Sequence, residues 1–599
     1  MFSYTAPLKD MQFVLNHVLD APAILAALPA FADVDADLMQ QVTEQAGRFA
    51  GEILAPLNAP GDRAGCRFDN GAVSTPAGFA DAYRQFCDAG WPALACAPEY
   101  GGQGLPHVLN GVLFEMLSSA NLGWTMYPGL LHGAYACLSQ HASNELKAYY
   151  LPKIVSGEWL ATMCLTEAHA GSDLGLLRTK AVPSADGSFS ISGSKIFISG
   201  GEQDMTENIV HLVLARLPDA PAGSKGVSLF LVPKFLPDGA RNALHCSAIE
   251  HKMGIHGSAT CSMQFDGATG WLIGAPNRGL AAMFVMMNSA RLHVGLQGLG
   301  IAEAAYQNSL TYAQERLQLK AVNRPPQRQH EAADPIVMHP AVQRLLMTQR
   351  AYVEGGRMLA YWTGLMLDRA EGDPDPATRA ALHEQVSLIT PIVKSILTEQ
   401  GFQGASQALQ VFGGHGFICE TGIEQSLRDA RVTMIYEGTN EIQAIDLVLR
   451  KVLADGGARL EHFLAQIDQT AQQQGAFAFH AATLLNLTRR TRAACRAIAQ
   501  HALAQPALPY RVAGEVLRLI GHCALAWLWL RAARTALGMA SHDPAFHRSK
   551  QDTACYYFTY VLPEVEQLLG VIDACVQASG DSTHNAFPSD LMTYAEAAA

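Results

Sequence analysis

The stretch RDARVTMIYEGTNEIQAIDLVLRKVL, residues 428–453, decides how the rest of the sequence is interpreted. Its second half predicts an amphipathic helix, because apolar residues recur at intervals of three, four and three: Ile442, Ile445, Leu449 and Val452. Thr439 and Asn440 come just before this stripe, where a helix N-cap belongs. We therefore predict that Glu437 lies on a short connection between two ordered elements, from which a carboxylate can be directed at a ligand. A solvated surface glutamate is the alternative interpretation.

The string YEGTNEIQ, residues 436–443, together with the preceding RDA, resembles the catalytic segment of the flavin-dependent acyl-CoA dehydrogenases. Further stretches similar to that family follow one another in the family's order between about residues 90 and 450. The resemblance implies a mostly α fold with a small β domain. Its parts are an N-terminal helical domain, a middle β-barrel-like domain and a C-terminal helical bundle that carries the catalytic Glu437.

Composition indicates a globular protein of several domains. The chain has 599 residues, of which 49% are hydrophobic and 16% charged, and this length is too great for a single core. Its net charge of −12 argues against a nucleic-acid partner, which requires a basic surface. Any phosphate site must therefore be built locally.

Cysteine usage and hydropathy indicate a cytoplasmic protein without an integral membrane segment. The twelve cysteines include no CxxC pair, so we expect free thiols and no structural zinc or iron–sulfur cluster. The N-terminus resembles neither a signal peptide nor a transit peptide. The most apolar run, residues 521–533, is shorter than the roughly 18 residues of a membrane span and predicts a core helix.

Periodicity divides the chain into five predicted segments. They are an N-terminal arm (1–36), a helical domain (37–160), a β domain (161–272), a helical bundle (273–455) and an extra helical domain (456–599). Alternation around Asp186-Gly187 predicts a hairpin, and the apolar runs 210–214 and 227–232 predict buried strands. The proline-rich stretch 319–340 predicts an extended excursion between two long helices, which could shape the substrate pocket or an interface.

Two segments resemble the family's flavin-binding motifs. MCLTEAHAGSD, residues 163–173, is similar to the LTEPxAGSD signature, with Ala168 in place of the usual Pro. KIFISG, residues 195–200, has Phe197 where the family usually has Trp. The resemblance implies that FAD contacts residues of both segments: Met163, Leu165, Thr166, Gly171, Ser172, Phe197, Ile198 and Ser199. A polar turn and a core aromatic are the alternatives.

Two more segments imply an oligomer, a homodimer or a dimer of dimers. They resemble family motifs that bind the flavin of an adjacent subunit: ERLQ, residues 315–318, and QVFGGHGF, residues 410–417. The implied FAD contacts are Arg316, Gln410, Gly413 and Gly414, to which the resemblance adds Thr439. Leu317 and the absence of Phe-Gly after Gln318 depart from the family pattern. We do not assign His415 as the base, because the family varies at that position.

The resemblance implies α,β-desaturation of an acyl-CoA thioester. Glu437 removes the α proton, and hydride passes from Cβ to flavin N5. The implied substrate contacts are Ser172, Asn288, Arg291 and Gly438. A free glutamate has a pKa of about 4.3, so burial under the acyl chain and flavin must raise its basicity. We expect no metal, and an electron-transfer flavoprotein as electron acceptor.

Chain length, the N-terminal sequence and the C-terminal extension resemble a subgroup of the family. That subgroup includes 3-methylmercaptopropionyl-CoA dehydrogenases and some bacterial fatty acyl-CoA dehydrogenases, so both substrate types stay open. Two other functions also stay open: an acyl-CoA oxidase, which passes electrons to oxygen, and a non-catalytic family member that acts as a scaffold.

Overall fold

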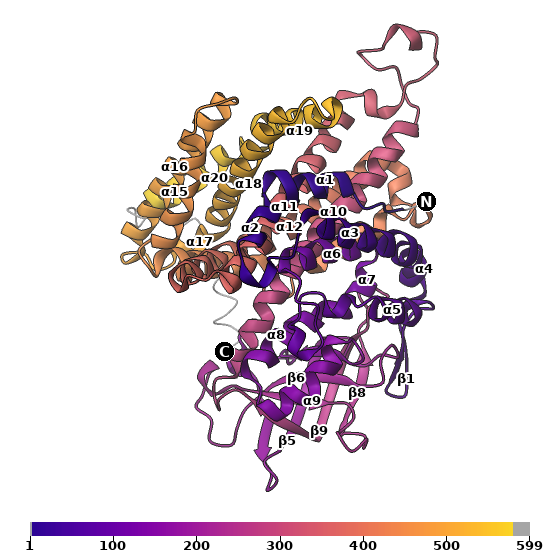
Figure 1. Ribbon diagram of the computed structural model, residues 1–599, viewed down its shortest axis with the longest axis vertical. Helices are drawn as coiled ribbons and strands as arrows, with labels where there is room; N and C mark the ends of the chain where they lie inside the picture. The colour runs from indigo at the N-terminus through magenta and orange to yellow at the C-terminus, as the bar shows by residue number, and fades with distance from the viewer. Residues whose placement is uncertain (1–2, 579–599) are drawn as a thin grey trace, which may run out of the picture. The chain divides into compact units, whose positions relative to one another are not determined.

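The computed structural model describes residues 3–578 and divides them into two compact units. The first unit comprises the chain up to His383 together with Leu397–Gly438. The second comprises Glu384–Ile396 together with the chain from Thr439 onward. Figure 1 shows the helices and strands of both units.

The N-terminal arm consists of short helices that bury one face. Helix α1 (Leu8–Phe13) continues as a π-helical turn (Val14–Val18), and α2 (Ala21–Ala26) follows. An apolar stripe of this arm faces the protein interior, since Met11, Val14, Leu15 and Val18 are all buried. Asp20 has φ 56° and separates the two helices, and Pro22 lies in the first turn of α2, where proline is tolerated.

Helices dominate the next segment, as predicted. They are α3 (Ala36–Arg48), α4 (Ala55–Ala64), α5 (Phe79–Asp88), α6 (His107–Ala120), α7 (Leu122–Thr125), α8 (Leu131–His141) and α9 (Asn144–Val155). The aromatic face of α5, formed by Phe79, Tyr83 and Phe86, is buried. A small hairpin of β1 (Arg67–Asp69) and β2 (Ala72–Ser74) was not predicted, because three-residue strands carry too little periodicity.

The middle of the first unit is a mixed sheet. Its strands are β3 (Leu160–Cys164), β4 (Lys180–Pro183), β5 (Phe189–Ser199), β6 (Ile209–Ala215), β7 (Ser228–Pro233), β8 (Leu244–Ile249) and β9 (Thr260–Ile273). The order is β3-β6-β7-β9-β5-β4, with β8 also on β9, and only the β3–β6 pair is parallel. An isolated bridge joins Lys180 of β4 to Arg216 beyond β6, so the sheet curls back toward itself.

Sequence predictions for the sheet are confirmed in detail. Strands β4 and β5 pair antiparallel around the Asp186-Gly187 turn. The two apolar runs form β6 and β7, which are buried along their whole length because both of their faces are covered.

Long helices complete the first unit. Helix α10 (Gly279–Glu315) packs against α6, α8, α11 (Pro340–Gly372) and α13 (Ile423–Thr433). The predicted excursion between α10 and α11 is confirmed: only the 3-10 turns Pro326–Arg328 and Ile336–Met338 interrupt it. Helix α12 (Pro376–Phe412) contributes its two ends to the first unit and its middle to the second.

In the second unit, the predicted cap of α14 (Asn440–Asp446) is confirmed, whereas the predicted stripe is confirmed only in part: Val452 is buried and Ile445 and Leu449 are half-buried, but Ile442 is exposed. Thr439 is the N-cap, and its side chain accepts a hydrogen bond from the backbone N–H of Ile442 at 3.3 Å. Ile442 is 37% exposed, whereas Gln443, Ala444, Leu447 and Val448 are buried. The mismatch at Ile442, Gln443 and Ala444 precedes the π-helical turn Leu447–Leu453, and it follows from the packing of α14 against α18 (Ala513–Gly538).

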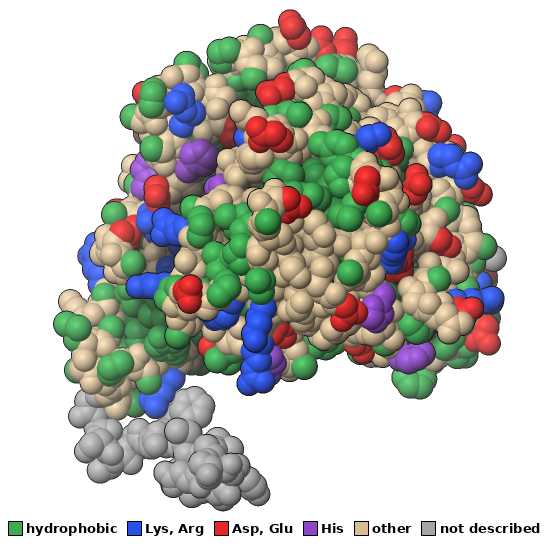
Figure 2. All heavy atoms as spheres, turned by 90° about the horizontal axis from the view of Figure 1, so that it is seen from below, with side chains coloured by type: hydrophobic (Ala, Val, Ile, Leu, Met, Phe, Trp, Pro, Cys, Tyr) green, Lys and Arg blue, Asp and Glu red, His purple; other side chains and the backbone are tan. Residues whose placement is uncertain are grey.

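The rest of the second unit is helical, with the elements α15 (Ala458–Gln472), α16 (Ala478–Ala502), α17 (Leu508–Arg511), α18 (Ala513–Gly538), α19 (Pro544–Tyr556) and α20 (Glu564–Ala578). Helix α18 is long and apolar enough to cross a membrane, but 89% of its most apolar window is buried inside the protein. The prediction of a core helix is therefore confirmed. The face drawn in Figure 2 mixes acidic, basic and apolar side chains.

Candidate active site

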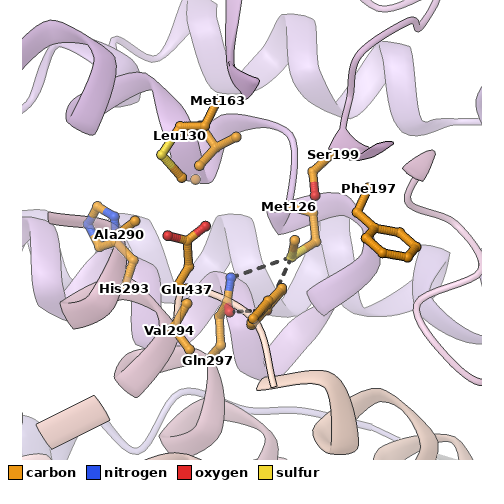
Figure 3. Close-up of a pocket in the computed structure, with 12 residues that line it drawn as sticks. Met126, Leu130, Met163, Phe197, Ser199, Ala290, His293, Val294, Gln297 and Glu437 are labelled. Carbon is orange, nitrogen blue, oxygen red and sulfur yellow. Dashed lines mark hydrogen bonds between the residues drawn. The ribbon is translucent and has the colours of Figure 1, made fainter. Parts of the chain in front are cut away.

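A cavity lies within the first compact unit, where its helices meet its sheet. Segments far apart in the sequence contribute the lining residues: Met126, Gly129, Leu130, Met163, Phe197, Ser199, Ala290, His293, Val294, Gln297, Tyr436 and Glu437. Figure 3 shows the Glu437 carboxylate pointing into the space between them.

One face of α10 forms a buried wall of this cavity. Ala290, His293, Val294 and Gln297 lie at helical spacing, and each is at most 7% exposed. Met126 and Met163 add further buried apolar surface. The wall is therefore mixed: Ala290, Val294 and the two methionines offer apolar surface to an alkyl chain, whereas His293 and Gln297 add polar groups.

A hydrogen-bonded triangle fixes the residue that precedes Glu437. The Tyr436 hydroxyl donates to Gln297 Oε1 at 2.5 Å and lies 3.6 Å from Met126 Sδ. The amide of Gln297 donates to the same sulfur at 3.5 Å. Burial raises the pKa of Tyr436, and the charges of Glu437 and Asp429 raise it further, so the hydroxyl stays a donor at neutral pH.

Glu437 lies on the connection after α13, as predicted. Its backbone has φ 55°, an uncommon conformation for a residue with a side chain, and Gly438 follows with φ 83°. Two contacts hold α13 in place: Asp429 accepts a hydrogen bond from the Ile255 N–H at 2.5 Å, and Arg428 pairs with Asp62 at 2.6 Å. The carboxylate is half-buried at the end of a well-anchored element.

His293 is a neutral polar group within the α10 wall. Its ring stacks on Phe114 with centroids 4.3 Å apart, and Nε2 lies 3.3 Å from Asn110 Nδ2. Burial lowers the pKa of His293 to about 4, so its ring is uncharged at neutral pH.

The opposite side of the cavity carries Phe197 and Ser199 on β5. Phe197 is 60% exposed and has φ 60°, because β5 bulges between Lys195 and Ile198. Ser199 places a hydroxyl beside this ring at the cavity (Figure 3). An exposed aromatic face beside a hydroxyl fits a planar cofactor with a polar edge, and the flavin of FAD has that shape.

The structure brings four predicted site residues to this cavity: Met163, Phe197, Ser199 and Glu437. The side chain of Ile198 is buried at 2% exposure and is not among the lining residues. Gly438 adjoins Glu437 in the chain and does not line the cavity.

Other predicted residues lie elsewhere in the fold. The loop that follows β3 contains Leu165, Thr166, Gly171 and Ser172. Of these, Gly171 and Ser172 are exposed. Asn288 and Arg291 lie on α10 beside Ala290 but do not line the cavity, and the Arg291 guanidinium is 3.3 Å from Asn288 Oδ1. The residues assigned to a neighbouring subunit's flavin are exposed: Arg316, Gln410, Gly413 and Gly414. Thr439 caps α14 in the second unit.

Sequence reasoning missed the α10 wall and the triangle around Tyr436. Gln297 belongs to the glycine-rich run 295–300, which predicts close helix packing but gives no sign of a polar wall residue. His293 stands alone in an apolar helix, where a core histidine is the ordinary expectation.

Family models match four consecutive parts of the chain. "Acyl-CoA dehydrogenase, N-terminal domain" matches residues 37–158, the "middle domain" model residues 162–268, and the "C-terminal domain" model residues 277–453. A fourth model, "Acetyl-CoA dehydrogenase C-terminal like", matches residues 463–579.

Known proteins resemble the chain over nearly its whole length. The 3-methylmercaptopropionyl-CoA dehydrogenase of Ruegeria pomeroyi is 43% identical over 573 residues, or 94% of this chain and 96% of that protein. The broad-specificity linear acyl-CoA dehydrogenase FadE5 of Mycobacterium tuberculosis is 33% identical, with 96% and 98% covered. A solved acyl-CoA dehydrogenase of Bacillus anthracis, complexed with FAD, has a similar fold, with a TM-score of 0.71, 20% identity, and 95% and 92% covered.

Proposed function

The chain belongs to the acyl-CoA dehydrogenase family, and from that membership we propose that Glu437 is the base of an FAD-dependent α,β-desaturation of acyl-CoA thioesters. The observation that supports this assignment most directly is the direction of the Glu437 side chain. Its carboxylate points into a cavity with a buried wall on α10, and Phe197 and Ser199 lie on the other side (Figure 3).

The residues of this chain bind and orient the substrate in the proposed reaction. The buried wall on α10 receives the acyl chain and excludes water from the reacting carbons. The triangle of Tyr436, Gln297 and Met126 holds the connection that carries Glu437. Glu437 accepts the α proton, and its backbone N–H is the proposed donor to the thioester oxygen, which gains negative charge as that proton leaves.

Bound FAD supplies the acceptor for the β hydrogen and its electron pair. Met163, Phe197 and Ser199 are the proposed contacts at the cavity, and the loop with Leu165, Thr166, Gly171 and Ser172 is the proposed contact for the polar part of FAD. The exposed positions of Arg316, Gln410, Gly413 and Gly414 accord with a cofactor shared between two copies of the chain. We therefore include a homodimer, or a dimer of dimers, in the proposal.

We propose two alternative acyl groups for the substrate: a short acyl chain with a thioether, or a linear fatty acyl chain. They come from the names of the two relatives described above. An electron-transfer flavoprotein is the proposed electron acceptor, and the cytoplasm is the proposed location. We also propose that the substrate is contacted by Ser172, Asn288, Arg291 and Gly438.

Anaerobic bleaching of the bound flavin by a panel of acyl-CoA thioesters tests this function. Glu437→Gln should keep the protein folded, yellow and able to bind thioester, while the bleaching rate falls by roughly 10²–10⁴-fold. Glu441→Gln is the matched control, since it removes an exposed carboxylate in the next helix and should leave the rate unchanged. A Glu437→Gln enzyme that reacts at the wild-type rate would contradict the assignment. Faster turnover in air than with an external acceptor would instead support an oxidase.

A further inference from the structure

A buried ion pair lies behind the two segments that are proposed to hold FAD. Lys195 of β5 is 0% exposed, and its ammonium lies 2.9 Å from Glu167 Oε1, on a side chain that is 6% exposed. Lys195 also donates to the backbone carbonyl of Leu165 at 2.9 Å. Burying two charges is costly unless they are paired and their remaining hydrogen-bonding capacity is used.

The carboxylate of Glu167 accepts further hydrogen bonds, which close the loop that follows β3. Its carboxylate accepts hydrogen bonds from the backbone N–H groups of Arg178 at 2.7 Å and Thr179 at 3.0 Å, and from the Thr179 hydroxyl at 2.6 Å. Its backbone exchanges two hydrogen bonds with Ala170, at 2.9 and 3.0 Å, and so forms a tight turn just before Gly171. One side chain therefore joins the start of the loop to its end.

Lys195 stands at the edge of the bulge that directs Phe197 outward. Strand β5 pairs with β9 at Lys195 and again at Ile198, with a register shift between them. Inside the bulge, the Ile196 N–H donates to the Thr166 carbonyl at 2.9 Å. The bulge is thereby bonded to the loop.

We propose that Lys195 and Glu167 are positioning residues for FAD, because their ion pair locks the loop 165–179 and the β5 bulge into one unit. The loop 165–179 and residues 195–199 of β5 contain all the FAD contacts proposed within a single subunit except Met163 and Thr439. The inference rests on the proposed function in that FAD is the ligand held.

The charges of the pair support this role. Burial alone would raise the pKa of Glu167, but the Lys195 ammonium and the Thr179 hydroxyl lower it to about 2, so the carboxylate is ionised at neutral pH. Burial lowers the pKa of Lys195, and Glu167 opposes that effect. Removing one partner leaves the other without its counter-charge in the interior.

The test compares three variants of the FAD-loaded protein. Lys195→Met removes the ammonium, and Glu167→Gln removes the negative charge while keeping an acceptor oxygen. Lys234→Met is the matched control: it breaks another Lys–Glu pair of the same sheet, between side chains 13% and 6% exposed, that joins neither FAD segment. The readouts are the dissociation constant of FAD, from the fluorescence of released flavin, and the visible circular dichroism of the bound flavin.

Lys195→Met and Glu167→Gln should each raise the FAD dissociation constant by roughly tenfold or more and change the flavin dichroism. Lys234→Met should leave the dissociation constant within about twofold of wild type, because the hydrogen bonds of the Glu202 carboxylate go to Gln203, Lys234 and Arg241 and not to the loop 165–179 or the β5 bulge.

Wild-type affinity and dichroism in both pair variants would overturn the inference, as would an equal loss of affinity in Lys234→Met. If Lys195→Met does not fold, as shown by far-ultraviolet dichroism, Glu167→Gln alone decides. A failure of the proposed function looks different: the wild-type protein would hold FAD, lose it in the pair variants, and fail to bleach with any thioester.

Discussion

Phe197 and Glu437 line the same cavity and share a left-handed backbone, with φ 60° and 55°. Residues other than glycine rarely adopt this conformation, which costs about 1–3 kcal/mol each unless the surroundings enforce it. Here the surroundings are the β5 bulge bonded to Thr166 and the Tyr436 triangle. The two residues with the most specific proposed roles are thus the two strained positions of the cavity.

The position of the Glu437 carboxylate should matter as much as its presence. Glu437→Asp shortens the side chain by one methylene and withdraws the carboxylate from the reacting carbon. Since a misplacement of about 1 Å can cost about 10²-fold, we expect a fall of that order in the flavin bleaching rate. The FAD dissociation constant should not change. A rate within a few-fold of wild type would show that the connection adapts, contrary to the anchoring described for it.

Two substitutions at Phe197 distinguish the effect of the aromatic ring from the effect of the strained backbone. Phe197→Ala removes the ring and keeps a strained residue, whereas Phe197→Gly removes both ring and strain. Both variants should bind FAD more weakly. The glycine variant should have the larger free energy of unfolding, by about 1 kcal/mol, because glycine adopts positive φ without cost. Urea unfolding of the two FAD-free proteins measures the difference, and a less stable glycine variant would contradict it.

The buried charge cluster at Arg357 should be essential for stability. Its guanidinium pairs with Glu115 and Glu303 at 2.5 Å each and with Asp10 of the N-terminal arm. Arg357→Met leaves three buried carboxylates without their cation, so we expect a loss of about 3–5 kcal/mol in the free energy of unfolding.

Arg84→Met is the control for that prediction. It breaks a pair with Asp81 whose side chains are about 70% exposed, and such pairs contribute at most about 1 kcal/mol. Urea unfolding followed by tryptophan fluorescence should rank the two variants accordingly. Equal losses would mean that the buried cluster contributes no more than a surface pair.

Mild acid should destabilise the fold through histidines that are buried in the neutral form. Burial lowers the pKa of His293 to about 4, whereas an unfolded histidine titrates near 6.5. Unfolding therefore takes up a proton in the window between these values, and the free energy of unfolding falls as pH falls through it, by up to about 1.4 kcal/mol per pH unit for this group.

The free energy of unfolding of the His293→Gln variant should fall less steeply than that of wild type as the pH is lowered from about 7 to 4. Urea unfolding at a series of pH values measures both slopes. Burial lowers the pKa of His211 to about 3, and the charges of Lys234 and Arg241 lower it as well. His211 should therefore still make the stability of the variant depend on pH, although less steeply. Parallel curves for the two proteins would show that His293 does not contribute.

The sequence predicts those parts of the fold that local chemistry determines. The Asp186-Gly187 turn sets the β4–β5 hairpin, and the prolines of 319–340 prevent a helix from running through the excursion between α10 and α11. The connection at Glu437 is predictable because Thr439 is a capping residue followed by a helix. In each case a few neighbouring residues determine the geometry.

Features that depend on tertiary contacts were beyond prediction. The buried face of α14 differs from the predicted stripe because α14 packs against α18, a helix far away in the sequence, and no local residue type signals that contact. The Lys195–Glu167 pair joins residues whose adjacency exists only after β5 bulges toward the β3 loop. His293 and Gln297 become polar wall residues only because α10 borders a cavity at that point.

Helix α12 belongs to both compact units, and this limits how the protein can be taken apart. Residues Glu384–Ile396 pack with the C-terminal helices, and a Cβ added to Gly521 of α18 would meet Ile396 at 2.9 Å. A fragment that begins after the Gly456-Gly457 pair would therefore lack a segment of its own core and expose the surface against which Ile392 and Ile396 pack. Expressing the C-terminal extension alone, or grafting it onto a shorter relative, requires that this internal segment be transferred with it.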